Sequence, residues 1–289
     1  MINDVALIFE GGGLRASGTA GVPVTLLEEG IEFSDVYGIS AGSSHTANYI
    51  SKDIWRTKTS FVEFFENHGV AGWGGFLRGR GYFNAEYIYE KACLPGEKLV
   101  FDFESFLENP ARMHIEAYER DTGKTVIWGK DDMKTISDLM KRVRACSTMP
   151  VFMPPVEVGG SVYLDGGLSD SRGILLEQAK RDGFKKFFIV LTQERGYRKK
   201  PDAHPLFIKA LLGRHKNVAE RMLDRYVRYN EILDEISALE ADGSAYVFCP
   251  RTMLVKSTTL DQSLLRESYR LGYAQAREEL PAWREFLEI

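Results

Sequence analysis

The sequence predicts an α/β fold, in which helices cover a mostly parallel central sheet and the C-terminal portion is mainly helical. Short apolar runs at residues 5–9 and 33–37 have the length and composition of buried strands. Each run leads into a glycine-containing turn, and a segment that can form a helix follows each turn. This order of strand, tight turn and helix is typical of proteins with a parallel sheet.

The remaining elements follow from the hydrophobic pattern and from turn residues. Asn84 is placed to cap a helix that ends at Cys93, and residues 121–123 can join two strands into a hairpin. In chain order we expect a strand at 5–9, a helix at 22–29, a strand at 33–37, helices at 43–50 and 84–93, hairpin strands at 112–118 and 124–128, a helix at 136–145, a strand at 156–162, a helix at 173–181, a strand at 185–192, helical residues at 206–239 with a break near 213, a strand at 245–249 and a helix at 261–280.

A chain of 289 residues, 44% of them hydrophobic, is long enough for one large α/β domain with a full core. We expect residues 1–200 to form a catalytic core and residues 201–289 to form a mostly helical portion that packs on the core as one unit. The first strand begins almost at once, which predicts no signal peptide. No apolar run approaches the ~20 residues that a membrane-spanning helix needs.

Composition and charge restrict the classes of function. A net charge of −4 predicts no general attraction to nucleic acid or to an anionic membrane. The cysteines, Cys93, Cys146 and Cys249, have neither C-x-x-C spacing nor the clustering of metal ligands. They are expected to be reduced thiols of a cytoplasmic protein that uses no metal or other cofactor.

Residues 38–42 match the pattern G-x-S-x-G between the second strand and its helix. A serine at the tip of such a turn points its hydroxyl outward, and the flanking Gly38 and Gly42 let the two backbones approach closely. The start of the helix also favours negative charge at this point. The motif therefore predicts that Ser40 is a nucleophile.

A second glycine turn, at residues 10–16, follows the first strand. Its consecutive glycines free several N–H groups to converge on one anion, and at the carboxyl end of a neighbouring parallel strand they would face Ser40 as an oxyanion hole. Gly11, Gly13 and Ala16 also satisfy the dinucleotide-binding pattern G-x-G-x-x-G/A. The second strand does not end in the acidic residue that this alternative expects.

Asp165 is followed by two glycines after a strand-like run. An Asp before two glycines is an ordinary turn by itself, but beside the two earlier motifs Asp165 becomes the best candidate for the base. A model-peptide Asp has a pKa of about 3.9, so we expect an apolar site that raises its pKa.

Together these motifs resemble those of the patatin-like phospholipases, of the small stand-alone bacterial type. The resemblance implies a three-layer α/β/α sandwich of patatin type and a Ser-Asp dyad, with Ser40 as nucleophile and Asp165 as base. It also implies that Arg15 holds the oxyanion loop. The further site residues that it implies are Gly12, Gly13, Leu14 and Arg15 of the oxyanion loop, Gly38 and Gly42 of the elbow, and Gly166 and Gly167 of the D-G-G box.

The order and spacing of the motifs match the family over roughly the first two-thirds of the chain. Residues 144–150 are similar to the family's A-S-x-x-x-P segment, with Cys146 in the place of the serine. Ala16 stands where the family usually has glycine, a change that could narrow the loop.

Two other interpretations remain open. An α/β-hydrolase with a Ser-Asp-His triad would use His204 or His215 after Asp165. Its elbow follows several strands, whereas here one strand precedes the elbow strand, and neither histidine lies in a convincing strand-end loop. A non-enzymatic lipid- or nucleotide-binding module is the other alternative, and the intact Ser40 and Asp165 motifs argue against it.

The preferred hypothesis is a serine acyl hydrolase that cleaves lipid carboxyl esters through an acyl-serine intermediate, as a phospholipase A or lysophospholipase does. Its expected partners are an acyl-ester lipid and, transiently, a membrane surface, with no nucleic acid. Residues 70–81 form either a mobile flap over the acyl pocket or an ordered loop. Basic residues also gather after the strand at 185–192, where they either contact a phosphate headgroup or an anionic membrane surface, or form a solvated loop. They are Arg195, Arg198, Lys199 and Lys200.

Overall fold

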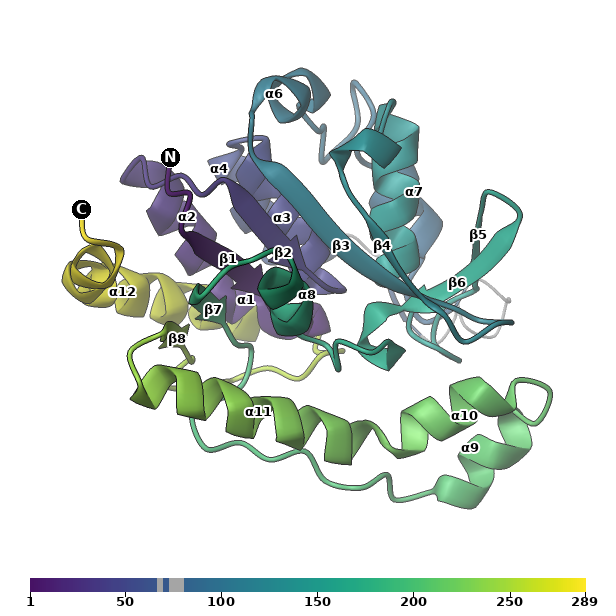
Figure 1. The fold of residues 1–289 in the computed structure, drawn as a ribbon. Coiled ribbons are helices and arrows are strands. Elements are labelled where there is room, and N and C mark those ends of the chain that lie inside the picture. Colours follow the sequence, from purple (N-terminus) through teal and green to yellow (C-terminus); the bar gives the residue numbers. More distant parts are fainter. Residues whose placement is uncertain (67–69, 73–80) are drawn as a thin grey trace.

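The computed structural model describes residues 1–66, 70–72 and 81–289, and among these eight strands form one sheet (Figure 1). The sheet order is β5-β6-β3-β2-β1-β7-β8, and β4 also pairs with β3. The central strands are parallel, whereas β4, β5 and β6 are antiparallel to their neighbours. The strands are β1 (Val5–Phe9), β2 (Asp35–Gly38), β3 (Arg112–Glu119), β4 (Thr125–Trp128), β5 (Val156–Val158), β6 (Ser161–Asp165), β7 (Lys186–Val190) and β8 (Ala245–Phe248).

Helices connect most of these strands, and the C-terminal portion is mainly helical, as expected. The α-helices are α1 (Ala16–Thr19), α2 (Gly21–Glu28), α3 (Ala41–Ile50), α4 (Ile54–Thr59), α6 (Phe103–Glu108), α7 (Ile136–Cys146), α8 (Leu176–Arg181), α9 (Pro205–Leu211), α10 (Lys216–Leu223), α11 (Arg225–Ala241) and α12 (Gln262–Leu287). A π-helix covers Glu86–Lys91, and 3₁₀ turns cover Gly13–Arg15, Phe64–Glu66, Lys130–Asp132 and Gly166–Leu168.

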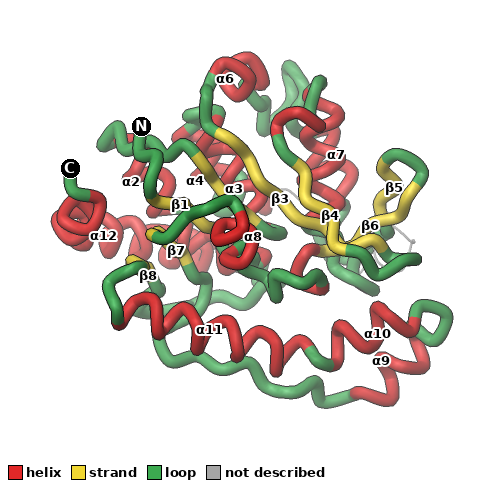
Figure 2. The backbone as a smooth tube through the Cα atoms, viewed as in Figure 1, coloured by secondary structure: helices red, strands yellow, loops and turns green. Residues whose placement is uncertain are grey.

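Two helical layers enclose the sheet because alternate side chains of a strand point to opposite faces. Val5, Leu7 and Phe9 of β1 pack in one core with α2, α3, α7 and α12. Ala6 and Ile8 pack in a second core with α8 and α11. Figure 2 shows these helices on the two sides of the strands, which is the predicted three-layer α/β/α arrangement.

The C-terminal helices differ from the expected ones in two respects. The stretch predicted as helical at 206–239 has the expected break near 213, between α9 and α10, and also a second break at Asp224, between α10 and α11. The helix predicted at 261–280 continues beyond Pro281, which lies inside it. Trp283, fully buried with its ring edge against Phe188, packs the last turns of α12 onto the sheet and offsets the hydrogen bond that proline cannot make.

Helix α12 also lies directly against the helices that follow the first glycine turn. A Cβ atom on Gly272 would be 1.8 Å from the carbonyl oxygen of Gly18, and one on Gly21 would be 2.4 Å from the Cα of Tyr273. The backbones of α1 and α12 are therefore in contact where both carry glycine. This contact ties the C-terminal portion to the start of the fold.

The interpretations of residues 70–81 as a flap or as an ordered loop fall largely on residues 73–80, which lie outside the described residues. Across the described ranges, none of the helices has both the length and the apolar composition that crossing a bilayer requires.

Candidate active site

Ser40 lies at the tip of the turn between β2 and α3. Its backbone has φ 55° and ψ −125°, a conformation that costs a non-glycine residue energy and persists because the surrounding packing holds it. A Cβ on Gly38 would lie 2.3 Å from the carbonyl oxygen of Gly42, and one on Gly42 would lie 2.3 Å from that of Phe9. The two glycines thus allow α3 to begin against β1 and β2, which positions the serine.

The register of the sheet brings Asp165 to the same level as Ser40. Gly38 at the end of β2 pairs with Ile115 of β3. Two residues further along β3, Ala117 pairs with Asp165 at the end of the antiparallel strand β6. Since Ser40 is two residues beyond Gly38, the serine and the aspartate lie at the same level, on either side of β3 near its carboxyl end.

The Asp165 carboxylate accepts a hydrogen bond from the amide of Gly167, whose nitrogen is 2.7 Å from Oδ1, and the Ser40 hydroxyl is near enough to this carboxylate to lower its pKa. Only 6% of the residue is exposed. Burial raises the pKa of this carboxyl, while the charge of Arg225, the nearby Ser40 hydroxyl and the hydrogen bond from Gly167 oppose the rise. Burial prevails, so Asp165 is a better proton acceptor near neutral pH than an ordinary aspartate.

The first glycine turn lines the same pocket as Ser40. Its Leu14 amide donates to the carbonyl of Ser257 at 3.0 Å, and its Arg15 amide donates to that of Gly12 at 3.3 Å. The amides of Gly12 and Gly13 have no acceptor within the part of the chain that the structure describes. Of the four residues expected to form an oxyanion hole, these two therefore keep an available N–H donor.

The loops enclose a cavity of about 260 Å³, with both Ser40 and Asp165 in its wall. Residues 144–150 contribute as well, because Met149 and Pro150 give the wall an apolar side and the carbonyl of Thr148 accepts from the Asp165 amide at 2.8 Å. The charged and phenolic residues of the wall are Glu10, Arg15, Asp165, Tyr197, Lys199, Asp202, Arg225 and Tyr229.

Glu10 and Arg225 are pocket residues that sequence reasoning misses. The buried Glu10 carboxylate accepts hydrogen bonds from the Thr192 amide at 2.5 Å and from the Tyr229 hydroxyl at 2.6 Å. It thereby joins the end of β1 to the loop after β7 and to α11. The position of Glu10 directly before the glycines is a weak sequence signal that it belongs to the site. Arg225 lies among many charged residues, and no sequence signal distinguishes it from them.

No histidine lines this pocket among the described residues. His204 is exposed ahead of α9, and His215 lies in a different cavity. His45 is buried against two phenylalanine rings, and its burial lowers its pKa to about 3. His114 contacts Asp35 at 3.0 Å. Within the same ranges, no group of three His, Cys, Asp or Glu side chains could hold a metal ion.

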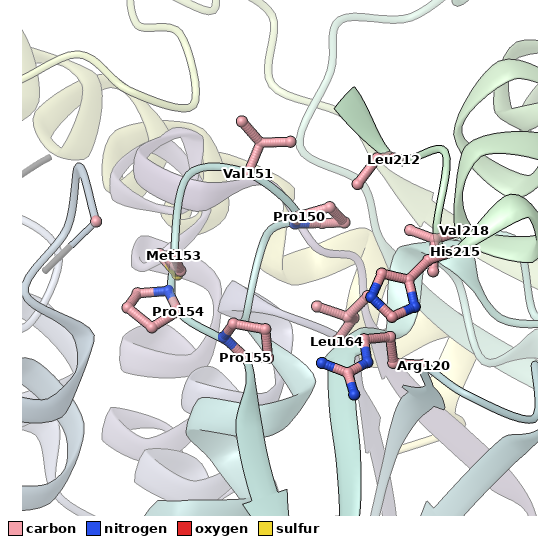
Figure 3. Close-up of a pocket in the computed structure, with 11 residues that line it drawn as sticks. Arg120, Pro150, Val151, Met153, Pro154, Pro155, Leu164, Leu212, His215 and Val218 are labelled. Carbon is pink, nitrogen blue, oxygen red and sulfur yellow. The ribbon is translucent and has the colours of Figure 1, made fainter. Parts of the chain in front are cut away.

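A second cavity, of about 320 Å³, adjoins the first (Figure 3). Pro150 lines both cavities, and Leu164, the residue before Asp165, lines the second. Leu212 and Val218, at the ends of α9 and α10, face them across this mainly apolar space. An apolar cavity therefore begins where the Ser40 pocket ends.

Residues 7–176 match the family model described as patatin-like phospholipase. The chain belongs to this family. Membership implies hydrolysis of lipid esters as the family-level activity. Residues 215–288, which include α11 and α12, match a second model described as a domain of unknown function, DUF6363.

Two other proteins are similar to this patatin-like chain. The uncharacterized protein YjjU of Escherichia coli strain K12 is 27% identical over 205 residues, which cover 65% of this chain and 52% of YjjU, so the chain spans about half the length of this relative. The crystal structure of VipD from Legionella pneumophila aligns over 96% of this chain and 67% of its own, with a TM-score of 0.51 and 12% identity. At that identity the likeness shows a shared fold.

Replacing Asp165 with Asn should raise the free energy of unfolding at neutral pH. Because burial raises the pKa of Asp165, the folded protein binds its proton more tightly than the unfolded chain does. Its contribution to stability is thus complete below the ordinary pKa of 3.8 and declines as pH rises through the folded value. The side chain of asparagine does not titrate, so in urea unfolding the gain of Asp165→Asn over the wild type should be larger at pH 7.5 than at pH 4.

The matched control is Asp170→Asn. Partial burial raises the pKa of Asp170, but the hydrogen bond from Thr125 and the charge of Arg221 outweigh it and lower that pKa. This variant should therefore lose stability at pH 7.5. A loss of the same size in Asp165→Asn would contradict the raised pKa.

Proposed function

We propose that this chain is a serine acyl hydrolase that cleaves the carboxyl ester of a lipid, with Ser40 as nucleophile and Asp165 as base. The observation that carries the proposal is a single pocket whose wall contains Ser40, the buried Asp165 and the unused amides of Gly12 and Gly13. A nucleophile, a base and oxyanion donors are the groups that acyl transfer requires.

The proposed reaction has two halves. Asp165 accepts the hydroxyl proton while Ser40 Oγ attacks the acyl carbon, and the amides of Gly12 and Gly13 donate to the oxygen that becomes negative. Asp165 then protonates the departing alkoxide, which leaves as an alcohol, and the acyl group stays on Ser40. Water next gives a proton to Asp165 and attacks the acyl carbon. Ser40 recovers that proton as the fatty acid is released.

The proposed base and the proposed substrate class are supported separately. Burial raises the pKa of the Asp165 carboxyl, which suits a carboxylate that must take a serine proton near neutral pH. The apolar side of the pocket at Met149 and Pro150 continues into the cavity of Figure 3, which offers room for an acyl chain. Family membership supports the same substrate class.

We also propose that α9 contacts an anionic lipid surface. Leu206 is 80% exposed and Phe207 is 65% exposed, and the nearby Lys209 and Arg214 are exposed as well. Apolar and basic side chains on one exposed helix are the combination that binds anionic bilayers. Leu212, directly after α9, lines the cavity that adjoins the Ser40 pocket, so a lipid held at α9 would lie beside that cavity.

Ser40→Ala should abolish hydrolysis of p-nitrophenyl butyrate and labelling by a fluorophosphonate probe, because loss of a nucleophile typically lowers kcat by about 10⁶. Asp165→Asn should lose nearly as much, since the two residues act as a unit. His204→Ala and His215→Ala are the controls and should keep most of the activity. An equally deep loss in either histidine variant would indicate a triad, and near-normal turnover by Ser40→Ala would exclude it as the nucleophile.

Gly12→Ala should lower kcat by about 10²–10³, the usual effect of losing one oxyanion donor, and change KM far less. A Cβ at Gly12 would lie 2.6 Å from Thr192 Oγ1, so the turn must shift. Its amide N–H groups would then no longer point at the oxyanion. Gly213→Ala is the control, because its Cβ would meet no atom closer than 3.4 Å. If calorimetry finds that the wild type binds NAD and Gly12→Ala does not, with hydrolysis unchanged, the turn is a nucleotide site instead.

Leu206→Ser with Phe207→Ser should lower the affinity for phosphatidylglycerol vesicles by at least about tenfold, because burying such side chains contributes about 1.5–3 kcal/mol each. Cosedimentation with the vesicles measures this. Leu107→Ser is the control, since Leu107 is 48% exposed on α6, far from α9 in the fold (Figure 1). Equal cosedimentation of the double variant and the control would remove α9 from the proposal.

A further inference from the structure

Three cationic side chains line the Ser40 pocket, and each comes from a different part of the chain. Arg15 belongs to the first glycine turn, Lys199 to the loop after β7, and Arg225 is the first residue of α11. Their charges affect one another. Burial and then the charges of Arg225 and Arg15 lower the pKa of Lys199 to about 8, so the protein holds positive charges together here at an electrostatic cost.

None of the three has an ion pair within the described ranges, whereas several basic residues around them do. Arg15 Nε donates to Thr192 Oγ1 at 3.4 Å, Arg225 Nε is buried without a hydrogen-bond partner, and Lys199 Nζ lies over the Tyr229 ring at 5.6 Å. The paired neighbours are Arg195 with Glu240, Arg198 with Asp234, and Arg221 and Arg228 with Asp170. Of the four basic residues after β7 that the sequence singles out, only Lys199 lines the Ser40 pocket.

The carboxylates of the same wall are already engaged. Glu10 accepts hydrogen bonds from Thr192 and Tyr229, and Asp165 accepts one from Gly167. Asp202 accepts from the amide of His204 at 2.9 Å. The charges of Glu10 and Asp202 still act on Lys199, and that of Arg225 acts on Asp165, but none of these carboxylates forms an ion pair with the three cations within the described ranges. A substrate that carries negative charge would pair with the cations directly.

We propose that Lys199 and Arg225 determine specificity for substrates that carry a phosphate group near the ester. This rests on the proposed function. A guanidinium presents a planar set of donors that matches phosphate oxygens, and an ammonium adds a point charge. Arg225 lies in the segment that matches a domain of unknown function, so that segment contributes a binding residue to the catalytic pocket.

The place of Arg225 limits how far the phosphate can be from the ester. Its Nη2 atom would be 2.8 Å from a Cβ on Gly167, and the Gly167 amide binds Asp165. A phosphate held by this guanidinium is thus only a few atoms from the reacting acyl carbon. In a glycerol phosphate that carries one acyl chain, the phosphate and the acyl carbon are only a few atoms apart. A neutral monoacylglycerol has no anionic group for the cations to bind.

The test measures binding without hydrolysis. In a Ser40→Ala background, calorimetry compares 1-O-octyl-glycerol 3-phosphate, whose ether cannot be cleaved, with 1-O-octyl-glycerol. Arg225→Gln and Lys199→Gln should each weaken binding of the phosphate compound by about 10- to 100-fold, the usual value of a hydrogen bond to a charged group. Binding of the neutral ether should change by less than about twofold. Arg221→Gln and Lys200→Gln, cationic neighbours that do not line the Ser40 pocket, are the controls and should behave as their parent does.

The outcomes separate this proposal from the proposed function. Equal affinity for the two ethers, or an equal loss for both in Arg225→Gln, would overturn the phosphate assignment even if Ser40 is the nucleophile. Weaker binding of the phosphate compound alone in Arg225→Gln and Lys199→Gln would support the phosphate assignment even if the proposed ester hydrolysis were not found. Inorganic phosphate should bind more weakly than the phosphorylated ether and compete with it. If it binds as tightly, the site recognises a free anion, and the proposal fails.

Discussion

Strand β3 has neighbours that run in opposite directions, and the geometry of the site depends on this. The parallel neighbour β2 ends at Gly38 and delivers Ser40, while the antiparallel neighbour β6 ends at Asp165. Although β6 runs against β3, it overlaps only the last residues of that strand, so its carboxyl end stops beside Ala117, at the level of the elbow. A one-residue slip of β6 would turn the Asp165 side chain to the other face of the sheet and separate it from Ser40.

Residues whose role is set by the local backbone could be predicted from the sequence. Gly38, Gly42 and Gly12 could be recognised from their motifs, and in the structure a side chain at each position would collide with a neighbouring backbone or side chain. The fold class could be predicted from the strands beside these motifs. Glu10 and Arg225 could not be found in the same way. They belong to the pocket through contacts between segments far apart in the chain, and a charged residue in a helix carries no sign of such a contact.

Tertiary packing also explains the errors at element level. Pro281 predicts the end of a helix, because proline lacks an N–H donor. The burial of Trp283 outweighs that local preference, and the helix continues. The stretch predicted as helical at 206–239 with a break near 213 has a second break at Asp224, which lets α10 and α11 present different residues to the pocket, Met222 from one and Arg225 from the other.

The proposed phosphate site and the proposed base are electrostatically coupled. The positive charge of Arg225 lowers the pKa of Asp165, against the effect of burial. A bound phosphate would offset that charge, so the carboxylate would become more basic when a phosphorylated substrate is in place. Substrate recognition and proton abstraction would then depend on the same guanidinium, and a neutral substrate would meet a weaker base.

The contact of Leu14 with Ser257, together with that of Gly18 with Gly272, has a consequence for biosynthesis. The partners are separated by roughly 240 residues, which a ribosome takes tens of seconds to add at about 5–20 residues per second. The serine motif therefore leaves the ribosome long before the segment that holds its glycine turn. A nascent chain therefore carries the elbow before the pocket around it is complete.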